Sequence, residues 1–149
     1  MRRSGRSSAA LLLDTCAMIW FAMGDRLAPA AIAAVERAGR EDGIFVSSIS
    51  AWEIGFLSRP SGTRRAALEF LPDPETWFDR LMATPGIREA PFSHRIAIGA
   101  SYLPGSDLHG DPADRLLLAT ARHLNVPIVT RDRRIIDYGR AGHVQVVAC

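Results

Sequence analysis

The sequence predicts one α/β domain built around a parallel sheet, and three observations support this prediction. The chain has 149 residues, of which 48% are hydrophobic and 23% charged, as is typical of a single soluble globular domain. Its longest apolar runs are far too short to cross a membrane. Short apolar runs alternate with segments patterned as helices, which is typical of a mainly parallel sheet covered by helices on both faces.

The predicted strands are short runs rich in Leu, Ile and Val. Strands buried on both faces of a parallel sheet read as continuous apolar stretches, not as alternating ones. We expect four such strands, at residues 10–13, 44–47, 127–130 and 144–147.

Capping residues and prolines mark the ends of several predicted helices. Pro29 can occupy the first turn of a helix, and Asp73 followed by Pro74 opens another. Asp111 and Pro112 form a typical N-cap and first-turn pair. The helices expected from these and weaker signals cover residues 16–21, 29–40, 75–83, 112–124 and 133–137, with a loop at 58–63.

The charge of the chain is concentrated at its beginning. All 18 basic residues are Arg, and three of them fall in the first six residues, so the rest of the chain carries 18 − 3 − 16, or −1. We interpret residues 1–8 as a flexible basic arm and residues 9–149 as the domain. A nearly neutral domain does not coat nucleic acid through bulk charge, although local Arg contacts remain open. The absence of Lys excludes P-loop proteins and pyridoxal phosphate enzymes.

The two cysteines, Cys16 and Cys149, show no pairing or metal-binding motif. Neither a disulfide framework nor a zinc site is indicated, which favours the reducing cytoplasm. The apolar stretch after the basic arm is interrupted by Asp14 and is shorter than the apolar region of a signal peptide. We therefore expect a cytoplasmic protein.

Four carboxylates occupy positions that solvent exposure does not explain. Asp14 comes directly after one predicted strand and Asp132 two residues after another, at the sheet edge where α/β proteins bind ligands. Glu53 lies within an apolar helical stripe, and Asp114 is the third residue of a helix, on its apolar side. Each has a simpler alternative, namely helix capping for three of them and an ion pair for Glu53.

The four positions together indicate a metal site. In a parallel sheet they can converge on one edge, and several carboxylates at close range cannot all stay ionised without a counter-charge. An all-oxygen set of ligands points to Mg²⁺ or Mn²⁺. Such clusters hydrolyse phosphodiesters, because the metal activates a water and stabilises the charge on the attacking and leaving oxygens.

The chain resembles a PIN-domain ribonuclease, and more narrowly a VapC-type toxin of a bacterial type II toxin–antitoxin pair. Four segments match in order and spacing, and the match extends over nearly the whole chain. These segments are residues 11–15, 46–54, 111–121 and 128–132.

The resemblance implies a compact PIN-like three-layer α/β/α fold and an endoribonuclease that depends on Mg²⁺, with Mn²⁺ as an alternative to it. It assigns the catalytic and metal-binding roles to Asp14, Glu53, Asp114 and Asp132. It also implies a homodimer, inhibition by a small VapB-like antitoxin, and a tRNA or rRNA loop as substrate, because single-stranded bases are accessible.

The residues that contact RNA are predicted from their place beside the acidic positions. Thr15 and Thr130 resemble the hydroxyls that line such sites, and Arg binds phosphate with two parallel hydrogen bonds. Arg131, Arg133 and Arg134 flank Asp132 and are the first choice. Further candidates are Arg59, Arg64, Arg65 and Arg115.

An apolar face is expected to be mainly core, with a part available as an antitoxin groove. It comprises Trp20, Phe21, Phe56 and Leu57. Three alternatives to a toxin remain at this point. They are a PIN nuclease of RNA processing without an antitoxin, a PIN module that binds RNA or protein without cleaving, and a structural α/β domain whose carboxylates are caps and ion pairs.

Overall fold

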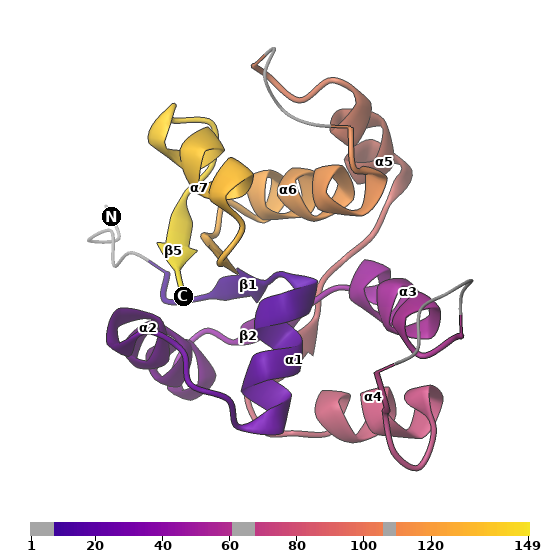
Figure 1. Cartoon of the computed structure of the whole chain (residues 1–149). Coiled ribbons are helices and arrows are strands. Elements are labelled where there is room, and N and C mark those ends of the chain that lie inside the picture. The colour runs from indigo at the N-terminus through magenta and orange to yellow at the C-terminus, as the bar shows by residue number, and fades with distance from the viewer. Residues whose placement is uncertain (1–7, 61–67, 106–109) are drawn as a thin grey trace.

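The predicted α/β/α class is confirmed by the computed structural model, which describes residues 8–60, 68–105 and 110–149. A five-stranded, wholly parallel sheet of order β3-β2-β1-β4-β5 lies between two layers of helices (Figure 1). Of the predicted basic arm at 1–8, all but Ser8 lies outside the described residues. None of the helices in these ranges is long and apolar enough to cross a membrane.

Strands and helices alternate along most of the chain. The strands are β1 (Leu11–Leu13), β2 (Ile44–Val46), β3 (Ile87–Glu89), β4 (Ile128–Thr130) and β5 (Val146–Ala148). The helices are α1 (Thr15–Met23), α2 (Pro29–Arg40), α3 (Ser48–Leu57), α4 (Pro74–Met82), α5 (His94–Ser101), α6 (Pro112–Leu124) and α7 (Arg133–Arg140).

The central strand β1 contributes to two hydrophobic cores, one on each face of the sheet. Leu11 and Leu13 belong to a cluster with α1 and α2, whereas Leu12 belongs to a cluster with α6 and α7. Successive side chains of a strand point to opposite faces, so this division follows from the pleat. Figure 1 shows the same layers, with α6 and α7 on one side of the sheet and α1 and α2 on the other.

The helix starts marked by capping residues are confirmed. Pro29 is the first residue of α2, and Asp73 and Asp111 are the N-caps of α4 and α6. Their side chains accept hydrogen bonds from the backbone N–H of Thr76 and Asp114, at 2.8 and 3.1 Å. These boundaries are legible in the sequence because a cap satisfies N–H groups only a few residues away.

The prediction of four strands was wrong, because β3 was missed and β5 begins two residues later than expected. The edge strand β3 has no continuous apolar run, since Arg88 and Glu89 are exposed. It forms by pairing with β2, where Ile44 lies opposite Ile87. The helix α5 was missed for a similar reason, since it buries only Ile96 and Ala100 fully.

Three helices begin at the carboxyl edge of the sheet. α1 follows β1, α3 follows β2 and α7 follows β4, each after a turn of one or two residues. These strands are neighbours in the sheet, so the starts of the three helices lie along one edge. The positive ends of their backbone dipoles favour negatively charged groups there.

Candidate active site

Asp14 lies at the centre of this edge and is 7% exposed. Its Oδ1 accepts a hydrogen bond of 2.7 Å from the backbone N–H of Ala17, so the capping role left open by the sequence is present. Burial raises the pKa of Asp14, hydrogen bonds from Thr130 and Ala17 partly oppose the shift, and the negative charge of Asp132 adds to it. Asp14 therefore caps α1, and burial destabilises the charged form of its carboxylate.

Asp132 lies beside Asp14, at the turn between β4 and α7. Its Oδ1 caps α7 by accepting a hydrogen bond of 2.8 Å from the N–H of Arg134. Its own N–H donates to Oγ1 of Thr130 over 3.0 Å. The fully buried Thr130 thus contacts the carboxylate of Asp14 and the backbone N–H of Asp132. Thr130 therefore lies at the acidic edge, and its role toward a substrate stays a prediction.

Glu53 reaches the same edge from α3. Its Oε1 accepts a short hydrogen bond from the hydroxyl of Thr15, the first residue of α1. Oγ1 of Thr15 also lies 3.0 Å from Oγ of the buried Ser50. Burial raises the pKa of Glu53, the bond from Thr15 lowers it, and the charges of Asp111 and Asp14 raise it further.

Asp114 approaches from the start of α6, which packs beside α3. It is half-buried, and burial is the largest cause that raises its pKa to about 7. The nearby negative charges add to this shift, in the order Asp111, Asp132, Glu53, Asp14. The folded chain therefore brings these carboxylates close enough to repel one another, as expected from the sequence.

All four predicted carboxylates lie close enough to Cys16 for their charges to act on its thiol. This exposed thiol is the second residue of α1. Burial of the sulfur and four negative charges raise its pKa to about 11, and those charges belong to Asp14, Glu53, Asp114 and Asp132. Cys16 was not among the residues predicted for the site, although its place two residues after Asp14 was a usable signal.

The donor chemistry of this edge fits a hard divalent cation. Carboxylate oxygens are the ligands that Mg²⁺ and Mn²⁺ prefer. The ion pairs Arg37–Glu41 and Arg140–Asp137 lie elsewhere in the chain. Within the described ranges, however, no three Asp, Glu, His or Cys side chains are arranged so that they could hold a metal ion as they stand.

The three Arg residues predicted to contact RNA differ in their surroundings. Arg133 and Arg134 are exposed in the first turn of α7, beside Asp132. The guanidinium of Arg131 instead contacts other parts of the chain. It donates to the backbone carbonyls of Cys149 and Arg26, and it stacks on Trp20.

The remaining RNA-contact candidates are mostly structural or lie outside the described ranges. Arg115 donates from Nε to the carbonyl of Ala100 over 3.0 Å and so joins α6 to α5. The guanidinium of Arg59 lies 5.6 Å from the ring centre of Phe56. Arg64 and Arg65 lie outside the described residues.

The expected apolar face has a packed part and an exposed part. Trp20, Phe21 and Leu57 pack against the core on the α1 and α2 side, as expected. Phe56 is 50% exposed and pairs edge to face with the exposed Trp52 of the preceding turn. Phe56 thus belongs to the part of this face that the sequence left open as an antitoxin groove, and not to its core part.

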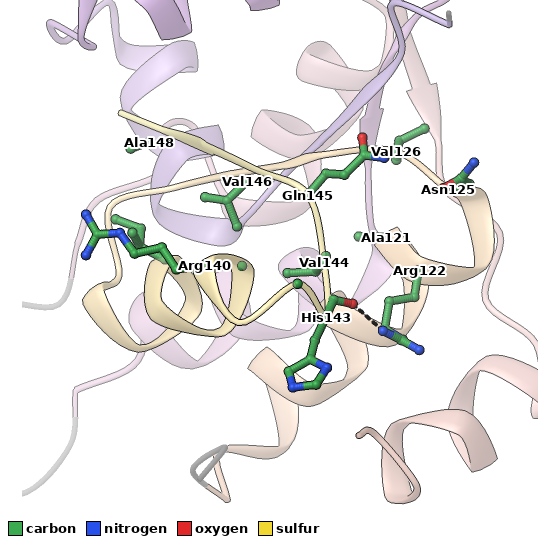
Figure 2. Close-up of a pocket in the computed structure, with 13 residues that line it drawn as sticks. Ala121, Arg122, Asn125, Val126, Arg140, His143, Val144, Gln145, Val146 and Ala148 are labelled. Atoms are coloured by element: carbon green, nitrogen blue, oxygen red, sulfur yellow. Dashed lines mark hydrogen bonds between the residues drawn. The ribbon is translucent and has the colours of Figure 1, made fainter. Parts of the chain in front are cut away.

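A cavity of about 880 Å³ lies away from the carboxylates, between the ends of α6 and α7 and strand β5 (Figure 2). Arg122 and Arg140 line it, and the guanidinium of Arg122 donates to the carbonyl of His143. Both Arg residues lie in the last turns of their helices, where cations stabilise the carboxyl end of the dipole. Their positions thus have a structural explanation that requires no ligand.

Comparison with known proteins agrees with this architecture. The model of the PIN domain family matches residues 11–141. Ribonuclease VapC22 of Mycobacterium tuberculosis is 35% identical over 126 residues, which are 84% of this chain and 88% of that protein.

Solved structures of VapBC complexes share the fold. VapBC2 from Rickettsia felis, bound to a DNA fragment from its promoter, matches with a TM-score of 0.60 at 14% identity, over 93% of this chain and 98% of that chain. VapBC-5 from M. tuberculosis matches with a TM-score of 0.59 at 16% identity, over 95% and 99%.

The chain therefore belongs to the PIN domain family. Within that family it is similar to the VapC-type ribonucleases, and the resemblance predicted from the four sequence segments is confirmed.

Proposed function

We propose that this protein is a Mg²⁺- or Mn²⁺-dependent endoribonuclease and the toxin of a VapBC-type pair. The family and the 35% identity to a VapC ribonuclease support the reaction class. One structural observation carries the assignment of the site. Four carboxylates from four separate helices and turns act on the same thiol, Cys16, and burial disfavours the charged form of three of them, Asp14, Glu53 and Asp114.

Each carboxylate has a role in this proposal. Asp14, Glu53, Asp114 and Asp132 would hold the cation, which when bound supplies an activated water and stabilises charge on the phosphodiester oxygens. Thr15 keeps the carboxylate of Glu53 turned toward α1. Thr130 holds the turn that carries Asp132 and contacts Asp14.

The charge of the site favours a bound cation, whereas its geometry requires the side chains to rearrange before they can share one. The raised pKa values of Asp14, Glu53 and Asp114 favour a bound cation, because it would replace repulsion with attraction. Since no three side chains among the residues that the structure describes are arranged to ligate as they stand, the carboxylates must turn toward one another to share an ion. We therefore propose that binding of the cation and ordering of the site occur together.

The partners follow from the similarity to VapC proteins. We propose that a small VapB-like antitoxin inhibits the protein, that the toxin is a homodimer, and that it acts in the cytoplasm. The exposed pair of Trp52 and Phe56 on α3 is available for protein contacts. We propose a single-stranded loop of tRNA or rRNA as substrate, with Arg133 and Arg134 as phosphate ligands.

Cleavage of total RNA by the purified protein tests the proposed function. We expect a few discrete products with Mg²⁺ or Mn²⁺, and none with EDTA or with Asp14→Asn. Cleavage that persists in EDTA would refute the metal-dependent mechanism. Failure of folded, antitoxin-free protein to cleave would favour a PIN module that binds without cleaving.

The antitoxin part of the proposal has its own test. Expression of the protein alone is expected to stop growth, and expression together with a small DNA-binding protein encoded beside it is expected to restore growth. If expression without such a protein leaves growth unchanged while the purified protein cleaves RNA, the nuclease would belong to RNA processing instead.

A further inference from the structure

Arg131 connects parts of the chain that are far apart in sequence. Its Nε donates to the carbonyl of Cys149 over 2.9 Å, and its Nη2 donates to the carbonyl of Arg26 over 3.0 Å. The centre of its guanidinium lies 3.8 Å from the ring centre of Trp20. One side chain thus joins the turn after β4 to the chain end beside β5, the segment after α1, and α1 itself.

These three contacts depend on the planar shape of the guanidinium. The two donated bonds lie in its plane, and the indole of Trp20 covers one of its faces, so the plane is restrained in two ways. A lysine ammonium carries the same charge but has no plane and no fixed fork of donors. Arg131 and Lys at this position would therefore differ in geometry more than in charge.

The neighbours of Arg131 place this anchor within the candidate active site. Thr130, on one side, contacts Asp14 and accepts the N–H of Asp132. Asp132, on the other side, caps α7. β4 is held on its β5 side by the bond from the N–H of Cys149 to the carbonyl of Thr130, 3.0 Å long. The turn that carries Asp132 is therefore positioned by the contacts of Arg131.

The geometry points to Arg131 as a positioning residue. It anchors the turn that carries Thr130 and Asp132, so that Asp132 and Asp14 are held at the spacing that the site requires. This inference rests on the proposed nuclease function, and it replaces the predicted role of Arg131 as an RNA ligand. An RNA phosphate would have to compete with two backbone carbonyls and an indole for the same guanidinium.

The test uses Arg131→Lys, which keeps the positive charge and removes the planar set of guanidinium N–H donors. We expect kcat to fall on the order of 10–100-fold while KM changes little, because small displacements of catalytic groups reduce the rate of the chemical step. The affinity of the protein for Mn²⁺, measured by calorimetry without RNA, should fall about 10-fold. Arg140→Lys, the same substitution at an exposed position of α7, is the matched control and should change neither quantity.

Two further measurements distinguish positioning from general support of the fold. Trp20→Leu should lower kcat in the same way, and the double variant with Arg131→Lys should lose less than the product of the two single effects. Amide exchange followed by NMR should be faster in Arg131→Lys at Asp132 and Arg134, the two N–H groups of this turn. If Arg131→Lys lowers only the melting temperature, and leaves kcat and the affinity for Mn²⁺ unchanged below it, the inference is wrong.

A direct contact between Arg131 and RNA would have the opposite effect on KM and kcat. If Arg131 binds phosphate, its replacement by Gln should raise KM and reduce the salt dependence of RNA binding in EDTA, with kcat retained. That result would also overturn the inference. If the wild-type protein cleaves no RNA, the proposed function fails by itself, whereas the calorimetric and exchange measurements still decide the role of Arg131.

Discussion

Replacement of Asp114 by Asn should make the metal-free protein more stable at neutral and alkaline pH. Burial and neighbouring carboxylates raise the pKa of Asp114 from 3.8 to about 7 in the folded chain. Between these values the folded state binds a proton that the unfolded state has lost, so the free energy of unfolding falls as the pH rises. The penalty is complete above pH 7 and absent below about pH 4.

The size of the effect follows from the same shift. About three pKa units correspond to about 4 kcal/mol in a site sealed from water. Asp114 is only half-buried, so solvent screening reduces this to about 2 kcal/mol. Asn also loses the attraction of a carboxylate to the start of α6, about 0.3–1 kcal/mol. The net gain expected is therefore about 1 kcal/mol, or about 2–4 °C in melting temperature.

Thermal and urea unfolding of both proteins in EDTA, at pH 8 and pH 4, measures this gain. We expect it at pH 8 only, and we expect Mg²⁺ to raise the melting temperature of the wild type more than that of Asp114→Asn. Asp79→Asn, on an exposed face of α4, is the control and should have no pH-dependent effect. Loss of stability at pH 8, or a gain that is the same at both pH values, would refute the argument from repulsion.

Three other outcomes are expected. Thr15→Val removes the hydrogen bond that lowers the pKa of Glu53, so the acidic limb of the pH–rate profile should move to higher pH and return with Thr15→Ser; an unmoved limb would contradict this. Because the pKa of Cys16 is about 11, little of its thiol is ionised at pH 8. Alkylation of Cys16 by iodoacetamide at this pH, followed by mass spectrometry, should therefore be on the order of 10–100-fold slower than that of free cysteine. An equal rate would argue against the acidic surroundings. Leu118→Ala should lower the free energy of unfolding in urea by about 2–5 kcal/mol, whereas the exposed Ile32→Ala should cost less than about 0.5 kcal/mol; equal effects would refute the assignment of the core.

The sequence by itself determined the elements whose signals are local. Pro29 and Asp111 act on backbone groups within one helical turn, so the starts of α2 and α6 could be predicted to the residue. The buried strands β1, β2 and β4 were legible as apolar runs because both faces of each are covered. Asp14 and Asp132 stood out because each lies within two residues of the end of such a run.

Only the tertiary structure decided which groups meet. β3 is a strand because β2 supplies its hydrogen-bonding partner, and the bond between Thr15 and Glu53 joins residues 38 positions apart. The contacts of Arg131 depend on a carbonyl 105 positions away, so no local pattern distinguishes this residue from Arg133. The pKa of a carboxylate likewise depends on burial and on charges from several elements, and these exist only once the layers have packed.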